Sequence, residues 1–316
     1  MTEISITNNP HRNGFVLGHR HFAVLHEKCL QKLNLITDSI LGIQFGPFFK
    51  YGYTENCLEE LNINLMFDNK DSYVFAFCAF EHLKILGIPH VIVKDNRLKR
   101  STENDVSCSF CLPKTLEQLD FHSNVRSYNT RRIANLTILR WLNLKGVNMA
   151  NVTLRDCNGT IYGIENLEYL DMSGFNCRVL SEHLISHFPK LITLIAQDGN
   201  LGIGLNTLKD ASEFLKMNLD LKHIDLRKNS IKSLPDGFLN HSFRQKLSII
   251  LDRNNLQSLP NFPSKPNTFQ LISLKYNRIS CLSEDDMVKL NKIKPSNIFH
   301  RGNPIECSCN TLRFLK

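Results

Sequence analysis

Three windows in the last third of the chain repeat one spacing of apolar residues around an asparagine. They share the pattern LxxLxLxxNxLxxL, in the segments 221–238, 249–260 and 269–282, with Asn229, Asn254 and Asn277 at the asparagine position, and the first apolar position is weak in the window around Asn254. Six specified apolar positions would match by chance in about 0.5% of windows at this apolar content. Three matches in tandem therefore indicate an internal repeat.

Weaker copies of the pattern extend toward the N-terminus. We call the asparagine position the marker position, and in the upstream copies apolar residues lie 8, 5 and 3 residues before the marker. The upstream marker positions hold Asp38, Met66, Val91, Asn124, Val147, Phe175 and Gly199. From Asn124 to Asn277 the markers are 23 to 30 residues apart, a spacing typical of leucine-rich repeats. The longer gap before Asn124 predicts an inserted loop at 92–111.

The pattern predicts an α/β leucine-rich-repeat solenoid, shaped as a horseshoe with a parallel sheet on its concave side and an irregular or short-helical convex side. Alternate side chains of each LxxLxL stretch point inward, so successive stretches pair as parallel strands. About ten to eleven repeats occupy 30–302, and 1–29 is an N-terminal segment that could be a degenerate repeat. The clearest strands are expected at 118–122, 141–145, 169–173, 193–197, 223–227, 248–252 and 271–275.

The marker asparagines are expected to form a ladder inside the solenoid. An amide side chain can donate to and accept from backbone groups of neighbouring turns that would otherwise be buried without partners. The predicted ladder comprises Asn124, Asn229, Asn254 and Asn277. Val147, Phe175 and Gly199 cannot make these bonds, so the middle of the array is expected to be less regular.

Composition is that of a folded protein, with 42% hydrophobic and 22% charged residues. The net charge of +8 is spread along the chain, which is typical of a solvated basic surface. No run of 18 apolar residues marks a membrane span. The N-terminus lacks the pattern of a signal peptide, so an extracellular protein of this sequence is expected to be a fragment of a longer one.

Ten cysteines are compatible with an oxidising compartment. Cys29 and Cys57 each precede the first leucine of a repeat, where a buried structural role is expected. Cys177 lies in a core position and is expected to pack as an apolar residue unless it bonds Cys157. Cys108 and Cys111 form a CxxC without a second metal-binding pair, which favours a loop disulfide or thiols over zinc.

The segment 303–316 begins with NPxxCxC, the start of a disulfide-bonded cap that covers the end of an extracellular repeat array. Such a cap needs two further cysteines. Cys307 and Cys309 are therefore expected to lack their native partners in this chain.

Four N-x-S/T sequons lie off the predicted strands, where a glycan would not block the sheet. They are Asn135, Asn151, Asn158 and Asn240. Their placement favours a secreted glycoprotein.

For each candidate catalytic motif, a purely structural interpretation of the same residues is favoured. His183 and His187 have the spacing of a zinc helix, but Leu184 stands where the glutamate of a zinc peptidase would be, so an amphipathic return helix is expected. The run Gly202-Ile203-Gly204 lacks the third glycine of a dinucleotide site. We therefore expect no enzyme activity, no cofactor and no metal.

The uneven repeats, the turn Leu234-Pro235-Asp236-Gly237-Phe238, the sequons and the NPxxCxC segment together resemble Toll-like receptors over roughly residues 30–316. The resemblance implies a type I membrane receptor of innate immunity, with its repeats on the extracellular or endosomal side. Such receptors dimerise on ligand and signal through a cytoplasmic TIR domain. The alternative is a secreted or membrane-anchored adhesion or matrix protein that carries the same repeat and does not signal; a cytosolic repeat protein fits the sequons and cap cysteines less well.

Basic residues at outward strand positions form a candidate surface for a protein, microbial or polyanionic ligand. The candidate residues are His122, Lys145, Arg227 and Lys275 on the strands and Lys94, Arg97, Lys99 and Arg100 in the inserted loop. The alternative is neutralisation by the acidic or amide residues at the next outward position, namely Asp120, Asn143, Asp171 and Asp225.

Overall fold

The computed structural model describes residues 3–5, 16–17, 29–35, 42–43, 57–63, 65–68, 74–77, 80–88, 91–94, 109–120, 136–145, 157, 163–262, 268–292 and 298–306. The chain divides into two compact units. Unit 1 is Met1–Val152 with Tyr162–Ile164, and unit 2 is Thr153–Ile161 with Glu165–Lys316.

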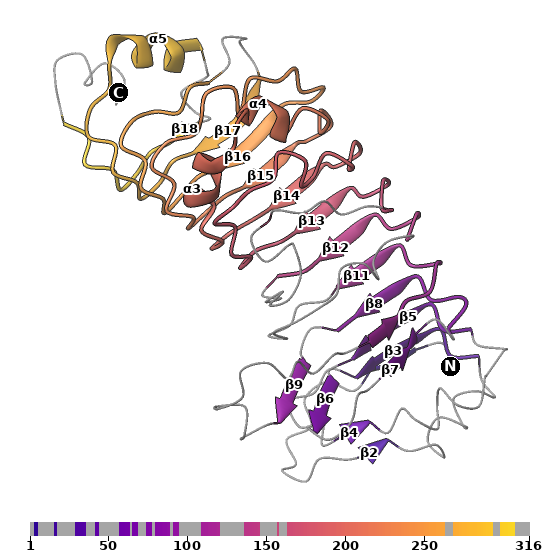
Figure 1. Cartoon of the computed structure of the whole chain (residues 1–316). Coiled ribbons are helices and arrows are strands. Elements are labelled where there is room, and N and C mark those ends of the chain that lie inside the picture. Colours follow the sequence, from indigo (N-terminus) through magenta and orange to yellow (C-terminus); the bar gives the residue numbers. More distant parts are fainter. Residues whose placement is uncertain are drawn as a thin grey trace. The chain divides into compact units, whose positions relative to one another are not determined.

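Parallel strands stack in chain order in unit 1 (Figure 1). They are β1 (Glu3–Ser5), β3 (Lys32–Leu35), β5 (Glu60–Ile63), β8 (Ile85–Gly87), β11 (Gln118–Asp120) and β12 (Trp141–Asn143). The leucines at the centres of β3, β5, β8, β11 and β12 are register partners and are buried. Residues 3–5 thus add a strand to the sheet from the N-terminal segment.

Short parallel pairs accompany this sheet in unit 1. They join β2 (Val16–Leu17) to β4 (Gly42–Ile43), β6 (Leu65–Asp68) to β9 (Val91–Lys94), and β7 (Val74–Ala76) to β10 (Ser109–Cys111). β9 and β10 bound the stretch expected as an inserted loop. Lys94 and Cys111 therefore belong to strands.

Unit 2 repeats the arrangement with closer agreement to the pattern. Its strands are β13 (Tyr169–Asp171), β14 (Thr193–Ile195), β15 (His223–Asp225), β16 (Leu247–Ile250), β17 (Phe269–Ser273) and β18 (Ile298–Phe299). Leu170, Leu194, Ile224, Ile249 and Ile272 are successive register partners, and all five are buried. The seven strands expected from the sequence are all present, and the leucine-rich-repeat solenoid is confirmed.

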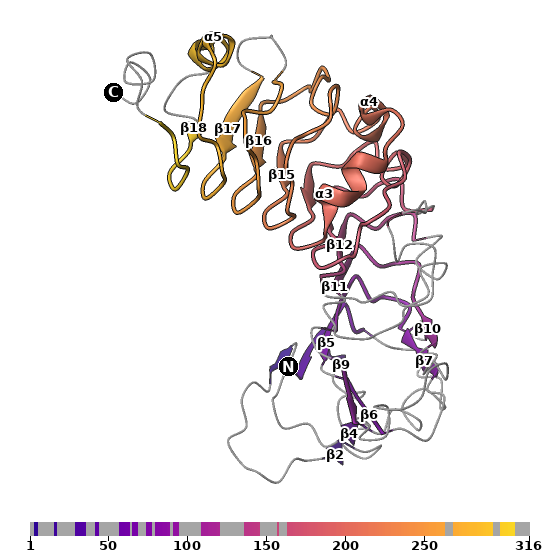
Figure 2. The ribbon, with the colours of Figure 1, turned by 60° about the vertical axis from the view of Figure 1, so that its left-hand side comes forward.

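The return segments of unit 2 contain short helices and buried phenylalanines. The helices are α3 (Leu201–Gly204), η3 (Leu205–Thr207), α4 (Ala211–Phe214) and α5 (Glu284–Lys292). Phe188, Phe214, Phe238 and Phe262 fill the interior, and Phe214 stacks on Phe238 with 5.8 Å between ring centroids. Figure 2 shows the turns after β15, β16, β17 and β18 in a row along one edge of the unit.

The helix expected around His183 and His187 is absent, so that prediction was wrong. Backbone bonds here span three residues, from Leu184 N to Ser181 O and from Phe188 N to Ile185 O. They form successive turns that bury Leu184, Ile185 and Phe188, and Pro189 stops any continuation into a longer helix.

Among the described residues, two disulfides join neighbouring repeats. Cys29 bonds Cys57 with 5.2 Å between Cα atoms, and Cys157 bonds Cys177 with 4.9 Å. Cys29 is exposed, so the expectation of a plain buried cysteine is corrected: the side chain is structural through its covalent bond. For Cys177 the sequence left open apolar packing or a bond to Cys157, and the structure shows the bond. Cys281 is an exposed free cysteine.

Several predicted site residues lie outside the described residues: His122, Asn124, Arg97, Lys99, Arg100, Asn135, Asn151, Asn158, Cys108, Cys307 and Cys309. In the part of the chain that is described, no helix has the length and apolar character needed to span a membrane.

Candidate functional site

The asparagine ladder of unit 2 supports the turns that follow the strands. Asn254 is buried, and its Oδ1 accepts from the backbone N–H groups of Asn229 (2.8 Å) and Ile231 (3.1 Å). Its Nδ2 donates to the carbonyls of Leu226 and Leu251, both at 2.9 Å. One side chain thus satisfies backbone groups of two consecutive repeats.

Asn229 and Asn277 make the same kind of contacts in their own turns. Asn229 Oδ1 accepts from Gly199 N at 2.8 Å, and Asn277 Oδ1 accepts from Leu256 N at 3.1 Å. Asn277 Nδ2 donates to Leu251 O and Leu274 O, each at 3.0 Å. The three side chains form consecutive rungs.

Asn303 continues the ladder by one more rung. Its Oδ1 accepts from Ile279 N at 3.1 Å, and its Nδ2 donates to Leu274 O at 2.8 Å and His300 O at 2.7 Å. The sequence assigned this residue to the cap motif only. The signal that could have identified it is its position 26 residues after Asn277, with Ile298 at the apolar position five residues before it.

Gly199 occupies a marker position without an amide side chain. A Cβ atom there would come within 2.6 Å of the Phe175 carbonyl, so the two turns approach too closely for a larger residue. Asn229 Nδ2 donates to Ala196 O at 2.6 Å, so this carbonyl has a partner without an amide side chain at 199. The strands therefore keep their register through the middle of the array.

Polar residues on the strand face neutralise one another, which changes the candidate ligand surface. Asp225 is buried, and Arg227 donates to both of its carboxylate oxygens, with the shortest contact, Nη2 to Oδ2, at 2.6 Å. Hydrogen bonding to Asp225 raises the pKa of Arg227 above its usual value. Gln197 Nε2 also donates to Asp225 at 3.0 Å. Arg227 is therefore neutralised by Asp225 within the protein.

Other residues on the strand face also form hydrogen bonds within the protein. Asp171 and Ser173 are buried, and Asp171 Oδ1 accepts from Ser173 N at 2.9 Å. Asp252 Oδ1 accepts from Ser273 Oγ at 2.6 Å and from Lys275 N at 2.9 Å. Within unit 1, Lys145 is exposed at the end of its repeat, and its N–H donates to Asn143.

The turn edge of unit 2 carries exposed side chains of a different kind. Each residue just before a marker has a left-handed backbone, with φ of 57° at Lys228, 57° at Arg253, 56° at Tyr276 and 81° at Gly302. Arg253 lies over the Tyr276 ring, 5.6 Å from its centroid, and Lys275 lies 4.7 Å from the centroid of Phe299. Lys275 therefore belongs to the turn edge as much as to the strand face.

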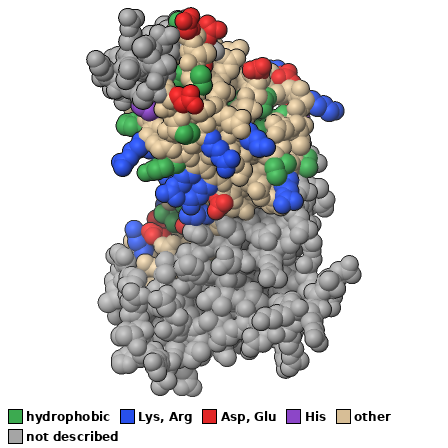
Figure 3. Space-filling model, turned by 90° about the vertical axis from the view of Figure 1, so that its left-hand side faces the viewer, with side chains coloured by type: hydrophobic (Ala, Val, Ile, Leu, Met, Phe, Trp, Pro, Cys, Tyr) green, Lys and Arg blue, Asp and Glu red, His purple; other side chains and the backbone are tan. Residues whose placement is uncertain are grey.

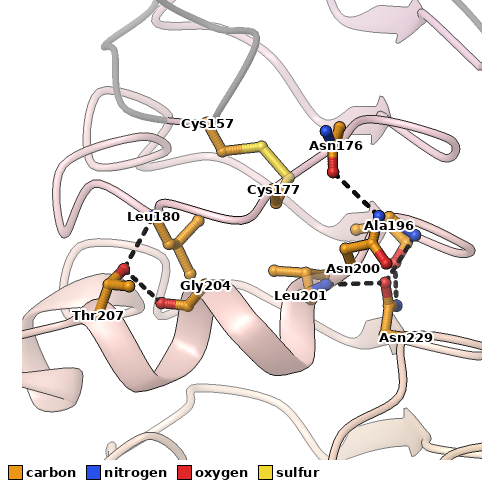
Figure 4. Close-up of a disulfide and its surroundings, with 11 residues drawn as sticks. Cys157, Asn176, Cys177, Leu180, Ala196, Asn200, Leu201, Gly204, Thr207 and Asn229 are labelled. Atoms are coloured by element: carbon orange, nitrogen blue, oxygen red, sulfur yellow. Dashed lines mark hydrogen bonds between the residues drawn. A yellow bond between two sulfur atoms is a disulfide. The ribbon is translucent and has the colours of Figure 1, made fainter.

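The Cys157–Cys177 disulfide lies beside the first short helix (Figure 4). Thr207 Oγ1 donates to Gly204 O at 2.7 Å and accepts from Leu180 N at 3.1 Å, which links the return segments of two repeats. Any Cβ at Gly204 would collide with the Cys177 carbonyl. The Gly202-Ile203-Gly204 run thus serves the close packing of the two segments.

Asn240 is exposed on the return segment after Phe238 and is accessible for glycosylation. We expect one N-linked glycan there when the chain passes through a secretory pathway, because the sequon Asn-His-Ser lies at the surface. Peptide mass mapping after enzymatic deglycosylation, which converts glycosylated asparagine to aspartate, checks this. An Asn240 that stays unmodified in the secreted protein contradicts it.

His241 gives unit 2 a pH-dependent stability. Burial lowers its pKa below the usual value and the Lys216 charge adds to this, while the Glu213 charge and a hydrogen bond to Phe238 oppose it. Its Nε2 is buried without a hydrogen-bond partner in the described structure. Because the folded pKa lies below the unfolded one, protonation favours unfolding.

Stability should therefore decline as the pH falls below about 6.5, the ordinary histidine pKa, and level off below the folded-state value. Thermal melts of the wild type and His241→Gln across this range measure the effect. The variant should show a shallower decline, while His183→Gln, which changes an exposed histidine, should follow the wild type. Parallel declines in all three proteins would show that other groups dominate.

Comparison with models of known protein families finds no match. Among solved structures, the chain is similar to the crystal structure of human 5T4, also called Wnt-activated inhibitory factor 1 or trophoblast glycoprotein. The match has 20% sequence identity and a TM-score of 0.48, and it covers 65% of this chain and 76% of that chain.

Proposed function

We propose that this chain is the ligand-binding part of an extracellular leucine-rich-repeat receptor of the Toll-like type, and that it acts by binding rather than by catalysis. The observation that carries the proposal is the scaffold of unit 2. In-register strands and a buried amide ladder hold one turn per repeat at a regular spacing, which produces a continuous and rigid surface. Repeat proteins use such surfaces to bind partners.

The covalent chemistry supports an oxidising location. The two disulfides between described residues join adjacent repeats, and structural disulfides persist in extracellular and secretory compartments. The exposed sequon at Asn240 agrees with this location. An extracellular module stabilised in this way fits a receptor ectodomain.

The Toll-like assignment is supported by the sequence motifs around this scaffold. The NPxxCxC segment begins at Asn303, which is itself a rung of the ladder, so the cap motif follows directly on the last repeat. The Leu-Pro-x-x-x-Phe turn places Phe238 in the core against Phe214. An adhesion or matrix protein would share these features without a signalling domain.

The sequence of the full-length transcript tests the proposal. We expect an apolar segment of about 20 residues downstream of the repeats, followed by a TIR domain. An open reading frame that ends or is anchored without a TIR domain would favour the adhesion or matrix alternative.

The location is tested separately with the chain fused to a secretory leader. We expect secretion with Cys157 and Cys177 linked, which peptide mapping without reduction detects. Recovery of folded protein with both thiols reduced would contradict an extracellular function.

A further inference from the structure

Basic and aromatic side chains lie together along the turn edge at the C-terminal end of unit 2. We call this surface the turn patch and define it as Arg253, Lys275, Tyr276, Phe299 and Arg301. Phe299 is the last residue of β18, and the other four residues come from the turns after β16, β17 and β18, which are neighbours in the sheet. Parallel strands are about 4.8 Å apart, so side chains of successive turns lie within contact distance.

Contacts between repeats make the turn patch continuous. Arg253 lies over the Tyr276 ring and Lys275 over the Phe299 ring. The Tyr276 ring lies across the next turn, because a Cβ at Gly302 would come within 2.5 Å of ring atom Cδ1. Tyr276 N donates to Arg301 O at 2.9 Å. The absence of a side chain at Gly302 thus allows the tyrosine to lie against the neighbouring repeat.

The cations of the turn patch are not neutralised by the part of the protein that the structure describes. Arg253 and Arg301 are exposed, and neither they nor Lys275 form an ion pair with a described residue. Lys228, one repeat away on the same edge, is also exposed and has no such pair. In Figure 3, Lys and Arg side chains gather on the described surface with hydrophobic side chains beside them. This contrasts with Arg227, which is held by Asp225.

Among the described residues, Asp252 lies beside the turn patch and Asp198 lies further along the same edge. Asp252 is half-buried and accepts from Ser273 and Lys275 N, and Asp198 is exposed several repeats away from Arg301. The edge therefore has an excess of positive charge.

Both aromatic side chains of the turn patch are exposed to solvent. Tyr276 is 50% exposed and Phe299 is 41% exposed. Aromatic residues and arginine are enriched in the energetic centres of protein–protein interfaces, whereas lysine is depleted there. The turn patch has two arginines, two rings and one lysine, which is closer to a protein interface than to a lysine-rich polyanion site.

We propose that the turn patch is the docking surface for an acidic segment of a protein partner, in which carboxylates meet Arg253 and Arg301 and apolar side chains contact Tyr276 and Phe299. The proposal deepens the proposed binding function by naming the surface and the chemistry of the partner. A second copy of this chain does not fit as a symmetric partner, because a two-fold interface would bring the same cations together.

Selection of phage-displayed random peptides on the secreted chain tests the proposal. The library is first depleted on the Arg253→Glu/Arg301→Glu variant and then selected on the wild type. We expect peptides rich in Asp and Glu that also contain aromatic or aliphatic residues. Enrichment of neutral or basic peptides, or of none, would overturn the proposal.

Affinity measurements with one synthetic selected peptide locate its binding site. Arg253→Glu/Arg301→Glu and Tyr276→Ala should each weaken binding about ten-fold. The matched control Arg178→Glu/Lys246→Glu makes the same change in net charge at exposed positions elsewhere, and should alter affinity less than about two-fold. Circular dichroism melts verify that every variant is folded.

Equal loss in the patch and control variants would reduce the effect to net charge and overturn the proposal. Tighter binding of a heparin oligosaccharide than of any selected peptide, abolished by the same patch variants, would assign the surface to a glycan and also overturn it. A peptide that binds the wild type and both double variants equally would overturn the turn patch as the docking surface. It would leave the proposed binding function intact.

Discussion

Replacement of Asn254 by alanine should destabilise the protein by about 3 kcal/mol, because two buried backbone N–H groups lose their acceptor. Asn229 N and Ile231 N both donate to Asn254 Oδ1. The carbonyls on the other side are less affected: Leu226 O still accepts from Asn229 Nδ2, and Leu251 O still accepts from Asn277 Nδ2. Most of the cost therefore comes from the two donors.

Urea unfolding monitored by circular dichroism measures this cost. Asn255→Ala is the matched control, because this neighbouring asparagine is only half-buried and its backbone N–H bonds Ile231 O whatever its side chain. Asn254→Asp keeps an acceptor for the two N–H groups and should fall between the wild type and Asn254→Ala. If Asn254→Ala and Asn255→Ala were equally stable, the ladder would not be an important source of stability.

Loss of the Cys157–Cys177 disulfide should destabilise unit 2 by about 3 kcal/mol, the effect expected for a crosslink that closes a loop of about this length. The two cysteines are 20 residues apart in the sequence, and Cys177 is buried beneath the return segment. Without the bond, the unfolded chain gains conformational freedom while the folded contacts of Cys177 remain nearly the same.

The double variant Cys157→Ser/Cys177→Ala tests this prediction and leaves no unpaired thiol. Its unfolding free energy is compared with that of Cys281→Ser, which alters the exposed free cysteine and should match the wild type. Unfolding of the wild type in the presence of a reductant should approach that of the double variant. A double variant as stable as the wild type would show that the disulfide closes a loop already ordered in the unfolded state.

The amino-acid sequence determined the positions that face the interior. Side chains alternate along a strand, so Leu194, Ile224 and Ile249 can be buried together only in one register, and the spacing of apolar residues specifies that register without further information. The marker asparagines were equally readable, since a polar residue recurring inside an apolar pattern needs backbone partners. The fold class and the ladder at Asn229, Asn254 and Asn277 follow from these two facts.

The tertiary structure decided what depends on distances between repeats. The spacing of Cys29 and Cys57 showed two repeats with a cysteine at the same place, but only the separation of the two Cα atoms made them a disulfide. The sequence left open whether Arg227 is a free cation or is neutralised by Asp225, and only the tertiary structure gave the distance between the two side chains. The rings of Tyr276 and Phe299 came into contact with cations of adjacent turns through the stacking of repeats 23 to 26 residues apart. A local pattern specifies which way a side chain points, whereas its charge state and its partners depend on which other segment lies beside it.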